Sequence, residues 1–309
     1  MEENNEKDIN QKIIEENNLR EILASANINF LFGSGVNGRA FPQLAGFIET
    51  NKFLDEKITD ENKSFEEKLN LLSDEDGNIA KEKFVKEFNE SQENISWESD
   101  DIKDIKDMLN NIYKLVEQTE NRQDSSYKVN LFTLNYDDII EDILSKECYI
   151  NNVISADSYK KTDFFNMIGY NFEYSKKIPT FVTTKLHGSV TKGKLSKDAI
   201  IYPGNKKYES ALGPKFFELM FLMKSELIKR NAVLIVIGYS GNDQHINGII
   251  SDAIESNLTL IWFRYNNDEK LPEVISKNIE KVIVINQLEN KIGTTKRCSH
   301  LVEEILKKW

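Results

Sequence analysis

The sequence Val-Asn-Leu-Phe-Thr-Leu-Asn-Tyr-Asp, residues 129–137, predicts how the rest of the chain is organised. It is a short apolar, β-prone run that ends in Asn135 and Asp137, and a helical pattern follows over 138–144. The polar side chains should therefore lie where a buried strand meets the start of a helix. Ligands bind at this edge of an open α/β sheet, so we take Asn135 as the candidate chemical centre.

Apolar runs elsewhere in the chain alternate with segments of helical spacing. The run at 232–237 is apolar on both faces, which is typical of a central parallel strand. We expect further strands at 28–32, 149–154, 180–189, 258–263 and 282–285, and helices at 214–231, 244–254 and 298–308. Strands that alternate with helices predict an α/β fold, here a Rossmann-like, doubly wound and mostly parallel sheet with a helical insertion.

The predicted domain organisation has three parts. Residues 1–27 begin polar and then carry apolar residues at helical spacing, which favours an N-terminal tail followed by a docking helix. The main domain spans 28–309. Within it, residues 50–125 are rich in Lys and Glu, and their apolar residues recur at helical spacing. We interpret 50–125 as a helical insertion between the first two strands of the sheet.

A glycine-rich stretch, Gly-Ser-Gly-Val-Asn-Gly at 33–38, follows the first predicted strand. It matches G-x-G-x-x-G in the strand, turn, helix order that gives the motif its meaning. Glycines let the backbone approach a pyrophosphate, and a helix N-terminus offers unpaired N–H groups to the anion. We therefore expect Gly33, Ser34, Gly35 and Val36 to bind phosphate. The alternative is an ordinary tight turn.

Two more predicted strands end in polar or glycine residues. The strand beginning at Thr180 delivers His187, whose imidazole titrates near neutral pH and can accept a proton. The strand at 232–237 ends in Gly238 and is followed by Ser240 and Asp243, which either bind the ligand or cap the next helix.

Two further histidines, His245 and His300, carry weaker signals. We expect His245 to pack or to lie on the surface, and we assign no function to His300. A metal site of His187, Asp243 and His245 lacks a compact ligand motif, so none is expected.

Composition and charge restrict the function classes. Hydrophobic residues make up 39% of the chain, which favours a folded protein, and the formal net charge of −11 gives no electrostatic footprint for direct contact with nucleic acid or an anionic membrane. No apolar run approaches the ~20 residues of a membrane span, and the acidic N-terminus lacks a signal-peptide pattern. We therefore expect a cytoplasmic protein. Cys148 and Cys298 are too few for a disulfide framework or a four-thiolate zinc site.

The marked strand ends resemble, in order, the signatures of the sirtuin family: Gly-Ala-Gly-Ile-Ser, Thr-Gln-Asn-Ile-Asp, Leu-His-Gly and Gly-Thr-Ser. The corresponding residues here are Gly-Ser-Gly at 33–35, Thr-Leu-Asn-Tyr-Asp at 133–137, Leu-His-Gly at 186–188 and Gly-Tyr-Ser at 238–240. This resemblance implies an NAD+ site in which Asn135 and His187 are catalytic. It also implies that Asp137, Gly238, Ser240 and Asp243 bind NAD+ together with the glycine-rich stretch. For Asp137, capping of the following helix is an equally weighted reading.

The chain departs from sirtuin deacylases in two respects. Their four-cysteine zinc module is missing, and their Pro-Asp-Phe-Arg element after the glycines is replaced by Arg-Ala-Phe-Pro at 39–42. The remaining pattern resembles the NAD+-consuming sirtuin-like effectors of bacterial antiphage defence, because Asn-Tyr-Asp at 135–137, Gly-Tyr-Ser at 238–240, Asp243 and Ile-Asn at 246–247 match their form.

The expected function is hydrolysis of NAD+ to nicotinamide and ADP-ribose, in an abortive-infection type of antiviral defence. We expect no zinc and no cofactor beyond NAD+ as substrate. A homo-oligomer is expected, and the resemblance implies that a HerA-like ATPase or another defence protein could be the partner. Two alternatives stay open: a non-catalytic module that senses NAD+ or ADP-ribose, and an NAD-dependent protein deacylase.

Overall fold

The computed structural model contains a central sheet of seven strands in the order β3-β4-β2-β1-β5-β6-β7, and every neighbouring pair is parallel. The prediction of a Rossmann-like, doubly wound sheet is confirmed. The strands are β1 (Asn27–Phe32), β2 (Lys128–Thr133), β3 (Ile150–Ile154), β4 (Thr180–Lys185), β5 (Ala232–Ile237), β6 (Thr259–Phe263) and β7 (Val282–Ile285). The described residues are 19, 21–118, 127–155, 179–190, 195, 200–204, 210–211, 213–278, 281–287 and 292–307.

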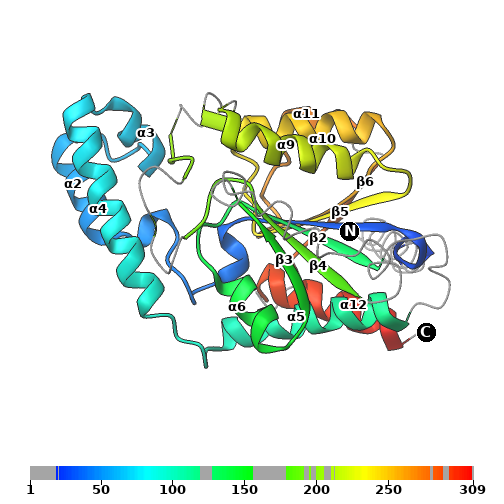
Figure 1. Ribbon diagram of the computed structural model, residues 1–309. Coiled ribbons are helices and arrows are strands. Elements are labelled where there is room, and N and C mark those ends of the chain that lie inside the picture. Colours follow the sequence, from blue (N-terminus) through cyan, green and yellow to red (C-terminus); the bar gives the residue numbers. More distant parts are fainter. Residues whose placement is uncertain are drawn as a thin grey trace, which may run out of the picture.

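Helices cover both faces of the sheet (Figure 1). One face carries α9 (Pro214–Leu227), α10 (Gln244–Glu255) and α11 (Glu273–Ser276), and the other carries α5 (Asp100–Gln118), α6 (Ile139–Lys146) and α12 (Thr294–Lys307). Successive side chains of a strand point to opposite faces, so Phe30 packs in the core of α5, α6 and α12, while Leu31 packs in the core of α9 and α10. Both faces of the central strands are therefore buried.

Three of the helices between β1 and β2 lie beside one end of the sheet, not on its faces (Figure 1). They are α2 (Ile48–Lys57), α3 (Phe65–Leu71) and α4 (Asp74–Glu93). Ser64 and Glu67 form a capping box that begins α3, and Ser73 caps α4. The fourth helix, α5, belongs to the layer on the sheet. The boundaries 50–125 of the insertion stay a prediction from composition.

The order of the strands reverses at β1. The chain fills one side of β1 with β2, β4 and β3, and then returns to place β5 on its other side. Such a reversal opens a crevice at the carboxyl ends of the two strands that flank it. The ends of β1 and β5 carry the glycine-rich stretch at 33–38 and Gly-Tyr-Ser at 238–240, which therefore meet at this point.

The segment after the first glycines differs from the prediction. We expected a helix directly after them, but two 3-10 turns follow, η1 (Ser34–Asn37) and η2 (Leu44–Gly46), and the first α-helix after the glycines begins at Ile48. Gly38 leaves η1 with φ +56°, and Pro42 restricts the backbone of Phe41 and has no N–H to donate. These residues interrupt the helical conformation.

Two sequence predictions fall largely outside the described residues. Of the N-terminal segment 1–27, the structure describes the end, where Leu19 and Leu23 are buried in the core. The stretch at 155–177 is polar and aromatic, for which the sequence predicts a loop, and the structure describes it only at Ser155. Among the helices that are described, none has both the length and the apolar composition that a membrane span would need.

Candidate active site

The register of the sheet brings the two candidate catalytic residues to one edge. Thr133 of β2 pairs with Lys185 of β4, so the residues two positions later, Asn135 and His187, leave the sheet at the same level. The ends of β1 and β5 lie in the same row, because Phe32 pairs with Thr133 and with Ile237. Four strand ends therefore deliver their following residues to one place.

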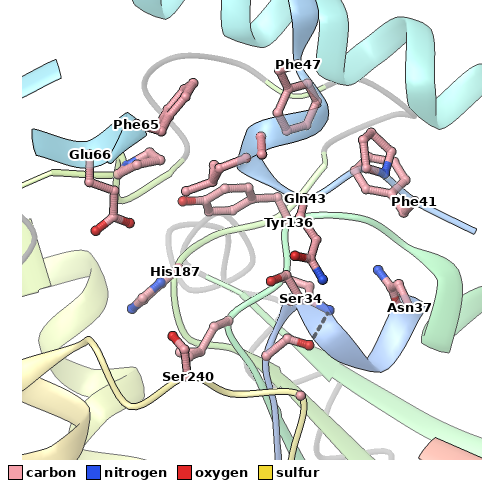
Figure 2. A pocket seen from close by; sticks show the side chains of 18 of the residues that line it. Ser34, Asn37, Phe41, Gln43, Phe47, Phe65, Glu66, Tyr136, His187 and Ser240 are labelled. Carbon is pink, nitrogen blue, oxygen red and sulfur yellow. Dashed lines mark hydrogen bonds between the residues drawn. The ribbon is translucent and has the colours of Figure 1, made fainter. Parts of the chain in front are cut away.

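A cavity of about 460 Å3 lies at this edge, within the range of roughly 300–1,000 Å3 that is usual for small-molecule sites. The strand ends form one side and the segments around η2, α3 and α4 form the other (Figure 2). Its polar lining residues are Ser34, Asn37, Gln43, Ser64, Glu66, Asn135, Asp137, His187, Ser240, Asn242 and Asp243. Its aromatic lining residues are Phe41, Phe47, Phe65, Phe84, Phe88, Tyr136 and Tyr239.

The glycines at the ends of β1 and β5 allow two backbones to touch. Gly35 N–H donates to the Gly238 carbonyl at 3.0 Å, and Gly238 has φ +65°. A Cβ on Gly33 would lie 2.4 Å from the Gly238 oxygen, and one on Gly238 would lie 2.3 Å from the Val36 nitrogen. Side chains do not fit here, so the glycines are required by the contact between the strand ends themselves.

Asn135 is buried and its amide has a fixed orientation. The side-chain nitrogen donates to the carbonyl of Gly33 at 3.3 Å, and the backbone N–H donates to the hydroxyl of Thr133 at 3.1 Å. A carbonyl only accepts, so the amide nitrogen must face Gly33. The amide oxygen is then the atom with which Asn135 can accept a hydrogen bond from a ligand or a water.

Asp137 is held by two donors. One carboxylate oxygen accepts from the Asn37 side chain at 2.8 Å, and the other accepts from the backbone N–H of Ile139 at 3.1 Å, at the start of α6. From the sequence, capping of this helix is the alternative to NAD+ binding; the N-cap residue of α6 is Asp138, and Asp137 supports the helix start from the position before it. Asp137 also lines the cavity, so a ligand contact stays a prediction.

Lys185 is a fully buried cation that ties β4 to the start of α6. Its ammonium group donates to the Asp137 carbonyl and lies 2.8 Å from the Glu141 carboxylate and 3.8 Å from that of Asp138. Burial by itself lowers the pKa of Lys185, but the three neighbouring carboxylates outweigh it and raise this pKa above its usual value. Burial also raises the pKa of Asp138 to about 6, against the opposing effect of Lys185.

His187 faces a second histidine. The Nε2 atoms of His187 and His245 lie 2.9 Å apart, and both side chains are buried. His245 belongs to the first turn of α10, and a carboxylate oxygen of Asp243 lies within 4.8 Å of a ring nitrogen of each histidine. The sequence placed His245 in packing or on the surface, and no local pattern signals its contact with His187.

Tyr239 fixes the loop that carries Asp243. Its hydroxyl accepts from the Asp243 backbone N–H at 3.1 Å and donates to the Asn247 side chain at 2.9 Å. Asn247 in turn donates to the Gly241 carbonyl at 2.7 Å. Burial, followed by the charge of Asp243, raises the pKa of Tyr239, so the phenol keeps the proton that it donates.

Glu66 lines the cavity, although no sequence pattern predicted it. It lies on α3, far from every strand-end motif in sequence, and its side chain extends toward the part of the cavity with His187 and Ser240 (Figure 2). Burial raises the pKa of Tyr136 well above its usual value, and the charges of Asp243 and Glu66 add to this effect. The carboxylate of Glu66 therefore contributes to the field in the cavity. In the sequence, Glu66 lies in an acidic segment of helical spacing. That pattern predicts a solvent-exposed face, so nothing in it indicates the cavity.

Most predicted ligand-binding residues line the cavity. Gly33, Ser34, Gly238, Ser240 and Asp243 do so together with Asp137. Gly35 and Val36 lie in the same turn, but they are not among the lining residues; Gly35 contacts Gly238 and the Val36 carbonyl accepts from Thr295 of α12.

Comparisons with known proteins found similar chains among solved structures. Among solved structures, a chain from "Structural Basis for the Mechanism and Regulation of Sir2 Enzymes" has 12% sequence identity and a TM-score of 0.47, over 95% of this chain and 97% of that chain. A chain from "Crystal structure of a Sir2 homolog-NAD complex" has 13% identity and a TM-score of 0.46, over 94% of each chain. The comparison with curated proteins found no match.

The family comparison covers the strands that carry the candidate residues. The model of the SIR2-like domain matches residues 129–283, which extend from β2 to β7 and include Asn135, His187 and Ser240. Because this match spans half of the chain, the chain belongs to the SIR2-like domain family.

Proposed function

We propose that this protein is an NAD+ glycohydrolase that cleaves the bond between nicotinamide and ribose. The observation that carries the proposal is the register of β2 and β4, which delivers Asn135 and His187 at the same level into one cavity. A carboxamide and an imidazole from neighbouring strands, beside the glycine-lined ends of β1 and β5, suit a sugar attached to a pyrophosphate.

The chemistry makes modest demands on the protein. The C1′–N1 bond breaks and its electron pair moves to the pyridinium nitrogen, so nicotinamide leaves as a neutral molecule. Positive charge develops on the ribose, and the oxygen of a water attacks C1′. His187 accepts one proton of that water, which then passes to solvent, and the products are nicotinamide, ADP-ribose and a proton. No strong general acid is needed.

Each cavity residue has a role in this scheme. Asn135 accepts a hydrogen bond from the attacking water or a ribose hydroxyl through its amide oxygen, which holds the reacting groups in position. His187 acts as the general base, a role typically worth about 10²–10⁴ in rate. The carboxylates of Asp243 and Glu66 stabilise the positive charge that develops on the ribose.

The proposal is tested by incubating the purified full chain with NAD+ and measuring free nicotinamide. Asn135→Ala should lower kcat by about 100-fold or more, with the secondary structure and melting temperature kept. Asn94→Ala, the same change at an exposed position at the end of α4, should match the parent. If the Asn135 variant hydrolyses NAD+ at the parental rate, the catalytic assignment is wrong.

The same assay separates the two alternatives. A sensor would bind NAD+ in calorimetry without releasing nicotinamide, and nothing in a sensor requires the polar pair at the strand ends. A deacylase would release nicotinamide only when an acyl-lysine peptide is added. Release from NAD+ alone, at the same rate with and without the peptide, would favour hydrolysis over both.

We also propose that hydrolysis serves antiphage defence, with activity held back until a trigger arrives. Support comes from the form of the motifs at 135–137 and 238–247, which resemble those of NAD+-depleting defence effectors. Control through homo-oligomer assembly, or through a partner such as a HerA-like ATPase, belongs to the same proposal. Cells that express the protein should lose NAD+ after phage infection, and cells that express Asn135→Ala should not.

A further inference from the structure

The contact between His187 and His245 forms inside the protein, although 58 positions separate the two residues. Their ring centroids lie 5.1 Å apart with an interplanar angle of 37°, and the Nε2 atoms are within hydrogen-bond distance at 2.9 Å. The side chains are only 3% and 9% exposed. His187 lines the cavity, whereas His245 is not among its lining residues.

A hydrogen bond between two imidazole nitrogens restricts their protonation. One nitrogen must carry the proton and the other must present its lone pair. When His187 is the donor through Nε2–H, its neutral ring has an unprotonated Nδ1, which is then its basic nitrogen. In that arrangement the contact leaves Nδ1 as the nitrogen of His187 that can accept a proton.

We propose that His245 is a positioning residue for His187: it accepts the hydrogen bond from Nε2–H and so directs the basic Nδ1 to the attacking water. The inference rests on the proposed hydrolysis of NAD+. In the reaction, Nδ1 takes one proton from water and the ring becomes an imidazolium. The neutral His245 keeps its hydrogen bond to this cation, and the nearby Asp243 carboxylate balances the charge.

The start of α10 is built to hold His245 in place. Asp243 and His245 are, respectively, the N-cap and second residue of this helix. The hydroxyl of Tyr239 binds the Asp243 backbone and the Asn247 side chain, which fixes the first turn from both sides. A rigid support of this kind keeps a hydrogen-bond partner at a constant distance.

The kinetic test uses two substitutions of His245 in the full chain. His245→Leu should lower kcat for nicotinamide release by about 10- to 100-fold, less than His187→Ala, with KM within about threefold. His245→Gln should recover most of this loss, because its side-chain oxygen can accept the same hydrogen bond. His300→Gln, the same change at an exposed histidine, should match the parent. Equal losses in the Leu and Gln variants would overturn the proposal.

A second readout does not depend on activity or on folding of the Leu variant. The chain has three histidines, so nitrogen-15 NMR can assign each ring by substitution. The parent should show His187 as one tautomer protonated at Nε2, and His245→Gln should keep it. Two tautomers of His187 in the parent would overturn the proposal. If the parent releases no nicotinamide, the proposed function fails, and this measurement still decides the arrangement of the pair.

A bound metal ion is the alternative explanation for the proximity of His187, Asp243 and His245. After dialysis against a chelator, the full chain is titrated with Zn²⁺ or Mn²⁺ by calorimetry. The hydrogen-bonded pair predicts no stoichiometric binding at this cluster. One ion per chain, lost in both His245→Leu and Asp243→Asn, would show that these residues are ligands and would overturn the proposal.

Discussion

The side chain of Asn37 has an amide oxygen that is available to a ligand. Its amide nitrogen faces the Asp137 carboxylate, because an ionised carboxylate only accepts hydrogen bonds. The amide oxygen is buried, and among the described residues it has no hydrogen-bond partner. An unpaired buried acceptor costs about 1–3 kcal/mol. Since Asn37 lines the cavity, a donor on the ligand would recover this cost, and the carboxamide of nicotinamide is such a donor.

Asn37→Ala should therefore raise KM for NAD+ by about 5- to 50-fold, which corresponds to the loss of a hydrogen bond of roughly 1–2 kcal/mol. Steady-state kinetics of nicotinamide release measures this change. Asn51→Ala removes a half-buried amide that binds backbone carbonyls around α2 and lies outside the cavity, so it serves as the control for a lost amide hydrogen bond. A similar KM in both variants would mean that Asn37 does not contact the ligand.

At the scale of elements, helices outside the sheet layers complete the cavity. Phe84 and Phe88 of α4 pack edge-on against Tyr136, with ring centroids 6.3 and 6.0 Å from it, so the end of β2 is held by the insertion. The first turn of α3, the helix before α4, carries Glu66, which lines the cavity. The insertion therefore supplies charge as well as packing.

Glu66→Gln should lower kcat by about 10- to 100-fold with little effect on folding, because the amide cannot stabilise positive charge on the ribose as the carboxylate does. Rates of nicotinamide release at saturating NAD+ measure the change. Glu67→Gln provides a matched control on the same helix: Glu67 is exposed, and Gln can also serve in the capping box. Comparable losses in the two variants would point to an effect on α3 as a whole.

Lys185 joins two elements beneath the cavity, β4 and α6. Lys185→Met should lower the free energy of unfolding by about 3–5 kcal/mol, because Glu141 and Asp138 would then lack their buried counter-charge. Lys224→Met breaks an exposed ion pair with Asp252 and should cost about 1 kcal/mol or less. Denaturant unfolding of the two variants measures the contrast, and equal values would show that the Lys185 network contributes no more than a surface pair.

At the scale of the whole molecule, the cavity lies between the ends of the central strands and the segments beside the sheet. The strand ends lie on one side, and η2, α3 and α4 lie on the other. A ligand that fills the cavity contacts both parts, so its binding energy should stabilise them together. A bound ligand should therefore stabilise the sheet and the helices beside it against unfolding together.

NAD+ at about 100 times its Kd should stabilise the Asn135→Ala variant by about 2.7 kcal/mol, a rise in Tm of roughly 5 °C. This variant is chosen because it should bind NAD+ without consuming it. Hydrogen exchange should slow both at the ends of β1 and β5 and in α3 and α4. Protection confined to the strand ends would contradict a cavity shared with the insertion, and ATP at the same concentration controls for binding of adenosine and phosphate alone.

The sequence by itself determined the alternation of strands and helices, and it placed Asn135, His187 and Gly238 at strand ends. Those features depend on local periodicity and on where an apolar run stops, which can be read along the chain. Only the tertiary structure decided that His245 meets His187, that Glu66 reaches the cavity and that the glycines contact one another. These contacts join residues about 60 to 200 positions apart. They follow from sheet register and from the packing of an insertion, which no local pattern encodes.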